Sequence, residues 1–200
     1  GADWDERCVA LDEEGRLAFS ARPADAATVA LLRQRFPAGD AGQIVTLPDY
    51  RCIAPFFAPL PHAKPAWPAL AALFIDYGEP DGGIADTLQA VRSHLYEHPL
   101  TSPGEADLST LVDFGECARL AKDQQFDVDG PVTQAEFLGG LGAIERASRL
   151  MHANPAKAGA VEAGLARLLA PQGMGGRFKA IGLRRGLADP LPGLADASAA

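Results

Sequence analysis

The sequence has few cysteines, few basic residues and no long uncharged apolar run. Its three cysteines form no Cys-x-x-Cys pair and no spaced ligand set, which excludes a cysteine zinc site and indicates a reducing compartment. The longest weakly charged stretch, residues 52–75, contains Lys64 and five prolines, so it cannot be a membrane helix. Lysine and arginine total 18 against 26 acidic residues, giving a net charge of −8. This balance argues against binding to nucleic acid or to an anionic membrane surface.

The remaining composition is that of a globular protein. The 200 residues are 48% hydrophobic and 22% charged, so a disordered or fibrous chain is excluded. Residues 1–7 lack the basic and then apolar pattern of a secretory signal. We therefore expect a soluble cytoplasmic protein without membrane insertion, whose partner is a protein or a small molecule.

Several catalytic and cofactor motifs are also missing. The sequence has no Gly-x-Ser-x-Gly elbow and no P-loop. Gly140-Leu-Gly142 follows residues with a helical pattern and lacks a third nearby glycine, so a dinucleotide loop is not expected there. Gly173–Gly176 precedes a predicted strand and not a helix. Close packing of backbone is the expected role of both glycine clusters.

The order of predicted elements indicates an α/β or α+β fold. A six-proline segment at 48–68 interrupts the pattern, and we expect a packed loop there. Asp113 with Glu116, and Thr133 with Glu136, have the spacing of helix caps. The predicted elements are a hairpin at 8–19, a helix from Pro23 to about Phe36, strands at 44–47 and 71–78, a helix at 84–93, a helix after Asp113, a strand at 126–130, a helix of about five turns after Thr133, a helix after Pro155, a strand at 177–183 and a frayed tail from Pro190.

The most informative single segment is residues 71–78, an apolar run that ends in Asp76-Tyr77-Gly78. This pattern is typical of a buried strand in an α/β sheet, where ligands bind beyond the carboxyl end. Asp76 is therefore a candidate acid or base. The sequence alone leaves open whether it converges with other acids, and whether Asp113 is only a helix cap.

The segment His94-Leu-Tyr-Glu97-His98 matches the His-x-x-Glu-His pattern of inverted zinc peptidases. That chemistry needs both histidines on one face of a helix. Pro99 follows directly and disfavours helical geometry at residue 98. We expect surface polar residues there and no metal site.

A series of motifs in fixed order resembles the MidA family of S-adenosylmethionine-dependent methyltransferases. Trp4–Arg7 with Val9, Leu11 and Gly15 also resembles a hairpin segment of that family. The family includes a mitochondrial complex I assembly factor that methylates arginine. The other motifs are Leu73–Gly78, Asp86–Ala90 with His94, Pro103–Leu108, Val112–Phe114, Gly130–Gln134 with Phe137-Leu138, and Met174-Gly175 with Phe178-Lys179.

The resemblance implies the C-terminal half of a longer enzyme. The family's glycine-rich cofactor loop lies upstream of the segment matched by Trp4, and these 200 residues contain no such loop. We therefore expect the later part of a Rossmann-like class I methyltransferase sheet with a helical insertion, and the main S-adenosylmethionine contacts outside this chain. The alternative is a non-catalytic interaction or assembly module that kept this part of the fold.

The resemblance also implies site residues, partners and boundaries. The substrate would be a protein, with a respiratory-complex subunit as one candidate, and open sheet edges would favour self-association. The expected segments are a hairpin and helix at 1–47, a proline-rich loop at 48–70, the α/β domain at 71–187 and a tail at 188–200. The implied catalytic residues are Asp76, His94, Asp107 and Asp113, and the implied substrate-binding residues are Tyr77, Gly78 and Gln134.

Overall fold

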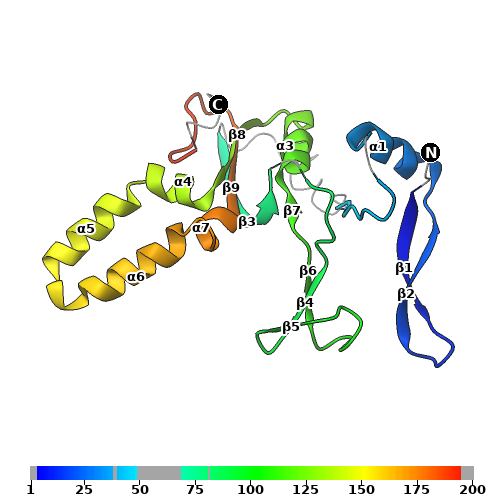
Figure 1. Ribbon diagram of the computed structural model, residues 1–200. Helices are drawn as coiled ribbons and strands as arrows, with labels where there is room; N and C mark the ends of the chain where they lie inside the picture. Colours follow the sequence, from blue (N-terminus) through cyan, green and yellow to red (C-terminus); the bar gives the residue numbers. More distant parts are fainter. Residues whose placement is uncertain (1–3, 38–39, 49–68, 81, 195–200) are drawn as a thin grey trace. The chain divides into compact units, whose positions relative to one another are not determined.

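The computed structural model describes residues 4–37, 40–48, 69–80 and 82–194, which divide into two units (Figure 1). Unit 1 consists of residues 1–46 and 84–110, and unit 2 consists of residues 47–83 and 111–200. Unit 1 contains strands and one helix, and unit 2 contains strands and several helices. The predicted mixed α/β class is therefore confirmed. Residues 84–110 belong with the N-terminal segment and not with the segment that begins at residue 71. The packed loop expected at 48–68 lies outside the described residues apart from Pro48.

The first part of unit 1 is a β-hairpin followed by a helix. Strands β1 (Asp5–Leu11) and β2 (Leu17–Pro23) pair in antiparallel fashion, which confirms the predicted hairpin. Helix α1 (Ala26–Arg35) begins later than predicted, because Pro23 is still paired in the strand and Asp25 forms the cap. The carboxylate of Asp25 accepts the backbone N–H groups of Ala27 and Thr28.

The second part of unit 1 is a three-stranded sheet of order β5-β4-β6. It contains β4 (Gln89–Arg92), β5 (Leu95–Glu97) and β6 (Asp107–Ser109). The helix predicted over 84–93 is wrong, because Ser93 and His94 adopt φ of 50° and 66° and turn the chain back on itself. The predicted strand at 44–47 is also wrong, since residues 43–48 have no regular structure.

Side-chain contacts join the two parts of unit 1. Arg7 donates from both terminal nitrogens to one carboxylate oxygen of Asp86 at 2.9 Å. The same guanidinium lies over the ring of Phe19, which in turn contacts the His98 ring with centroids 5.4 Å apart. These contacts bring His98 into a structural role in the unit.

Unit 2 is built on a four-stranded sheet of order β7-β3-β9-β8. Strand β3 (Leu70–Glu79) pairs antiparallel with β9 (Phe178–Arg185), and β9 pairs antiparallel with β8 (Asp127–Thr133). The short β7 (Val112–Asp113) pairs parallel with the last two residues of β3. The predicted strands at 71–78, 126–130 and 177–183 are confirmed, although β3 is largely exposed and not buried as expected.

Helix α3 (Phe114–Asp123) covers one face of this sheet. The apolar core between α3 and the sheet contains five buried residues, each at most 6% exposed: Phe114, Ala121, Phe126, Ile181 and Leu183. A second cluster on another part of the unit contains Phe137, Ala180 and Leu194. Ala180 and Ile181 are successive residues of β9 and enter different clusters, because successive strand side chains point to opposite faces.

The helical part of unit 2 contains α4 (Gln134–Gly140), α5 (Ala143–Ala153), α6 (Ala158–Leu169) and α7 (Met174–Arg177). Figure 1 shows α5 and α6 side by side as an antiparallel pair that projects from the sheet. The predicted five-turn helix is interrupted, because Gly142 adopts a left-handed φ of 78°. A short 3-10 turn at Pro155–Lys157 leads into α6. Gly173 is the N-cap of α7 and residues 174–176 lie within this helix, which precedes β9, so the expectation that Gly173–Gly176 precedes a strand and not a helix is wrong.

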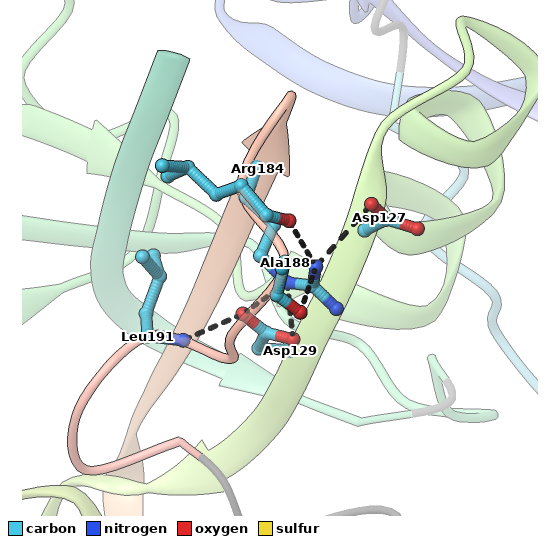
Figure 2. Close-up of polar contacts among 6 residues, drawn as sticks. Asp127, Asp129, Arg184, Ala188 and Leu191 are labelled. Carbon is cyan, nitrogen blue, oxygen red and sulfur yellow. Dashed lines mark hydrogen bonds and ion pairs between the residues drawn. The ribbon is translucent and has the colours of Figure 1, made fainter. Parts of the chain in front are cut away.

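The segment after β9 is held against the sheet, so the frayed tail predicted from Pro190 is wrong as far as Leu194. Arg184 donates to both carboxylate oxygens of Asp129 at 3.1 Å, to Asp127 and to the carbonyls of Leu187 and Ala188 (Figure 2). Asp129 also accepts the backbone N–H of Leu191 at 2.9 Å. Leu194 is only 1% exposed. Charged groups within the sheet therefore fix this segment, which we name the C-terminal strap (residues 187–194).

The start of α4 is the reciprocal capping box that the sequence predicts. Thr133 accepts the Glu136 N–H with its hydroxyl, and the Glu136 carboxylate accepts the Thr133 N–H at 2.8 Å. Two hydrogen bonds lower the pKa of Glu136 below its ordinary value of 4.5. The one from the Thr133 hydroxyl has the larger effect, and the one from the Thr133 N–H has the smaller effect. Because the pKa of Glu136 is lower in the folded protein, its hydrogen bonds with Thr133 contribute to the free energy of unfolding at neutral pH. This contribution is lost as the pH falls below about 4.5.

We expect Thr133→Ala to reduce the free energy of unfolding by about 1 kcal/mol, because the first turn of α4 loses its cap. Thr133→Ser keeps the hydroxyl and should be close to wild type. Urea unfolding followed by circular dichroism at several pH values measures both. A Thr133→Ala deficit that does not shrink in acid would show that Glu136 contributes nothing through this pair.

Candidate functional site

The candidate site is the carboxyl end of β3, where Asp76, Tyr77 and Gly78 follow one another. Asp76 is exposed, and its carboxylate accepts the Tyr77 N–H at 2.7 Å. Tyr77 is 48% exposed and lies opposite Phe178 on β9, with ring centroids 3.9 Å apart. Because successive strand residues point to opposite faces, the Asp76 carboxylate and the aromatic pair lie on different faces of β3.

Gly78 is buried because the start of α3 packs against it. A Cβ atom at this position would lie 2.3 Å from the Val112 carbonyl oxygen and 2.6 Å from the Phe114 ring. A side chain is therefore excluded. Glycine here allows β7 and α3 to approach the end of β3, and this packing positions Asp113 opposite Glu79.

Asp113 is 5% exposed and forms the N-cap of α3. Its Oδ1 accepts the Glu116 N–H at 2.9 Å, as the spacing predicts. The helix cap is therefore confirmed. A role of Asp113 toward a substrate stays a prediction.

Lys179 is a further candidate site residue, which sequence reasoning missed. It lies on β9 directly between Asp76 on β3 and Thr133 on β8, and it is only 8% exposed. Its ammonium donates to the Gly176 carbonyl at 2.7 Å. The positive charge also contributes, after the Thr133 hydrogen bonds, to the low pKa of Glu136. A lysine within the apolar strand sequence was the available signal, because buried lysines are rare.

Gln134 is buried and joins two helices of unit 2. Its side-chain amide donates to the Leu168 carbonyl of α6 at 2.8 Å. This contact explains its burial, and a substrate contact by Gln134 stays a prediction. Asp76, Tyr77, Gly78, Asp113 and Gln134 all belong to unit 2.

The other two predicted catalytic residues, His94 and Asp107, belong to unit 1. His94 occupies the exposed turn between β4 and β5, and Asp107 is an exposed residue of β6 paired with Val91. Glu105, two residues before Asp107, forms an ion pair with Arg92. Because these residues belong to unit 1 and Asp76 belongs to unit 2, their convergence on one site stays a prediction.

The His-x-x-Glu-His segment forms a hairpin turn and strand and not a helix. His94 is in the turn, Glu97 is in β5 and His98 contacts Phe19. Within residues 4–37, 40–48, 69–80 and 82–194, no group of three metal-ligating side chains is found. In the same part of the chain, no helix has the length and apolar character needed to cross a bilayer.

Three glycines of the two clusters, Gly140, Gly175 and Gly176, pack closely against backbone. Cβ atoms at Gly175 and Gly176 would lie within 2.3 Å of the Leu169 and Pro171 carbonyl oxygens. Gly140 packs against Gly193 of the C-terminal strap. The predicted packing role is confirmed for Gly140, Gly175 and Gly176, whereas Gly142 has a left-handed φ of 78° and precedes α5. Neither cluster supplies the strand–loop–helix geometry that binds a dinucleotide-like group.

The fold agrees with those of two solved structures from Burkholderia thailandensis. One, a protein crystallised with S-adenosyl-homocysteine, has a TM-score of 0.78 and 25% identity over 98% of this chain and 51% of its own. The other, an uncharacterised protein, has a TM-score of 0.76 and 23% identity over 98% of this chain and 52% of its own. The first of these two proteins is reported as a likely methyl transferase, and the two matches together show that this chain has the same α/β fold as both.

Sequence comparisons identify the family. The family described as "Putative S-adenosyl-L-methionine-dependent methyltransferase" matches residues 1–132, so the chain belongs to that family. The mitochondrial protein arginine methyltransferase NDUFAF7 of Danio rerio is 36% identical over 110 residues, and its Homo sapiens counterpart is 34% identical over 110 residues. These alignments cover 54% of this chain in both cases, and 26% and 24% of the relatives. The chain therefore spans about a quarter of the length of these curated relatives.

Proposed function

We propose that this chain is the C-terminal half of an S-adenosylmethionine-dependent methyltransferase that modifies arginine in a protein substrate. The observation that carries the proposal is the family match over residues 1–132. The arginine specificity is supported by the names of the NDUFAF7 relatives, at partial coverage. The exposed Asp76 at the end of β3 supplies chemistry suited to a cationic substrate.

The proposed role of Asp76 is to hold and orient a guanidinium. A carboxylate accepts two parallel N–H bonds from arginine, which fixes the plane and direction of the group. Methyl transfer to nitrogen needs this orientation and also the loss of a proton from a strongly basic group. Asp107, Asp113 and His94 are the proposed additional polar groups. Tyr77 is the proposed contact to another part of the substrate, because its ring and the Asp76 carboxylate lie on opposite faces of β3.

We propose that the main contacts to S-adenosylmethionine lie outside this chain. The support is that the sequence contains no glycine-rich cofactor loop, and that Gly140, Gly175 and Gly176 pack against neighbouring backbone. S-adenosylmethionine, when bound, would supply the methyl group. The residues of this chain would bind and orient the acceptor. Calorimetric titration of the isolated chain with S-adenosylmethionine is expected to show no binding. A micromolar dissociation constant would contradict the proposal that the main cofactor contacts lie outside this chain.

The test of the activity uses the full-length product of the gene and labelled S-adenosylmethionine with a protein extract. We expect Asp76→Asn to reduce methyl transfer at least about tenfold, because a neutral amide cannot pair with a guanidinium as a carboxylate does. The control is Asp123→Asn, an exposed acid of α3, which should retain activity. Equal activity in both variants would exclude Asp76 from the site. A full-length protein that transfers no methyl group would favour the non-catalytic module instead.

A further inference from the structure

Lys179 carries a positive charge in a largely apolar part of unit 2. Its side chain is 8% exposed, and it lies two residues before Ile181 of β9, on the face of the sheet that α3 covers. An ammonium can donate several hydrogen bonds, and among the described residues Lys179 has one acceptor, the Gly176 carbonyl at 2.7 Å. No ion pair joins Lys179 to a carboxylate within the part of the chain that the structure describes. Lysines buried to this extent are normally paired with an anion.

Two acidic side chains belong to the surroundings of Lys179, and both have other partners. Asp76 occupies the position directly opposite on β3, and its carboxylate accepts the Tyr77 N–H. The Glu136 carboxylate accepts the N–H and the hydroxyl of Thr133, which occupies the position opposite on β8. Neither acid forms an ion pair with Lys179 in the described part of the chain. The ammonium therefore has donor capacity left for an anion that these residues do not supply.

Lys179 lies at the same end of the sheet as the candidate site. Strand β9 is antiparallel to both of its neighbours, so its first residues lie beside the last residues of β3 and β8. Directly paired residues of an antiparallel ladder share a face, and their Cβ atoms are about 4.5–5.5 Å apart. Asp76 is exposed at this position. This end of the sheet thus places an acidic and a basic side chain next to each other on one face.

We propose that the Lys179 ammonium binds the carboxylate of an aspartate or glutamate in the substrate protein, within two residues of the arginine that Asp76 holds. An extended peptide advances about 3.3 Å per residue, so side chains up to two residues apart match the spacing of the Asp76 and Lys179 positions. One carboxylate balances the single charge of the lysine. This inference rests on the proposed function, and it assigns to Lys179 the choice of sequence around the modified arginine.

The second contact supplies a selectivity that Asp76 cannot provide alone. A carboxylate that pairs with a guanidinium accepts any accessible arginine, whatever its neighbours. A substrate without the adjacent acid leaves the buried ammonium of Lys179 unpaired, and sites discriminate strongly against ligands that leave a buried polar group without its partner. We therefore expect arginines with an acidic neighbour to be preferred by about tenfold or more.

The experiment uses the full-length product of the gene, labelled S-adenosylmethionine and pairs of short peptides. Each peptide has one central arginine in a background of glycine and serine. Aspartate is placed in turn at each of the two positions before and after the arginine, and asparagine replaces it in the matched peptide. At the best position, kcat/KM for the aspartate peptide should exceed that for the asparagine peptide by about tenfold or more. Fluorescence anisotropy measures binding of the same peptides independently of methyl transfer.

Variants of Lys179 test whether this residue is the origin of the preference. Lys179→Met keeps an unbranched side chain without the charge and should reduce the ratio of the two kcat/KM values to about one, whereas Lys179→Arg should retain most of it. Lys157→Met replaces an exposed lysine of the same unit and should leave the ratio unchanged. Circular dichroism verifies folding, and Lys179→Gln provides the same comparison if the methionine variant does not fold. The KM for S-adenosylmethionine should be equal in all of them.

The outcomes separate this inference from the proposed function. Equal losses for both peptides in Lys179→Met would overturn the inference, because Lys179 would then only support the Gly176 carbonyl. A wild-type protein without preference for aspartate, in transfer and in binding, would also overturn it. A higher KM for S-adenosylmethionine with an unchanged peptide ratio would assign the ammonium to the cofactor instead. Lys179-dependent binding of aspartate peptides by a protein without methyl transfer would sustain the inference and count against the enzyme.

Discussion

Replacing Gly78 with alanine is expected to lower the free energy of unfolding of unit 2 by about 3 kcal/mol. The new methyl group would lie 2.3 Å from the Val112 carbonyl oxygen and 2.6 Å from a carbon of the Phe114 ring. Neither neighbour can move cheaply. Val112 pairs with Gly78 in the sheet, and Phe114 is 1% exposed within the core under α3. The clash therefore separates β7 and α3 from β3.

The matched control is Gly164→Ala in α6, where a Cβ would meet no atom within 4 Å. Alanine within a helix is favoured over glycine, so this variant should gain about 0.5–1 kcal/mol. Urea unfolding monitored by circular dichroism compares the two variants under identical conditions. Opposite signs for the two substitutions are the expected result. A Gly78→Ala variant as stable as wild type would mean that α3 does not pack against the end of β3 as described.

Replacing Asp129 with alanine is expected to cost about 3 kcal/mol as well. Asp129 is 6% exposed and accepts bonds from the Arg184 guanidinium and from the Leu191 N–H. Its removal leaves a guanidinium that is 16% exposed with only Asp127 and two strap carbonyls. A buried charge without its main partner is far more costly than a broken surface pair.

The loss of Asp129 should also release the C-terminal strap. We expect limited proteolysis to cut residues 187–194 in Asp129→Ala under conditions where the wild-type protein resists. Asp123→Ala serves as the control, since its pair with Arg119 is exposed and should be worth about 0.5 kcal/mol. A strap that stays protected in Asp129→Ala would assign its attachment to Leu194 and the second apolar cluster alone.

Features determined by neighbouring residues could be predicted from the sequence. The caps at Asp113 and Thr133 follow from side chains three residues apart, and both form as expected. The β1–β2 hairpin follows from two apolar runs around an acidic turn. Asp76, Tyr77 and Gly78 were identified for the same reason, because a single apolar run ends there.

Features that depend on distant residues, or on an unusual backbone, could not be predicted. The β4–β5 turn uses Ser93 and His94 with positive φ, whereas such turns usually contain glycine or asparagine. Without that signal, residues 84–93 looked helical. The neighbours of Lys179 come from β3 and β8, about 100 and 50 residues away. Spacing along the chain gives no indication of such pairs, so the neighbouring positions of Asp76, Lys179 and Thr133 could be found only from the sheet register.

The interleaving of the two units constrains how the chain can be made. During synthesis, Arg7 and Phe19 of the β1–β2 hairpin can contact Asp86 and His98 only after residues 84–110 have been translated. The interval is longer for β3, because its partner strand β9 is translated about 100 residues later. An apolar strand therefore leaves the ribosome long before any described partner of its length exists. We expect the nascent chain to depend on holding chaperones through this interval, and folding yield to fall when translation is slowed between β3 and β9.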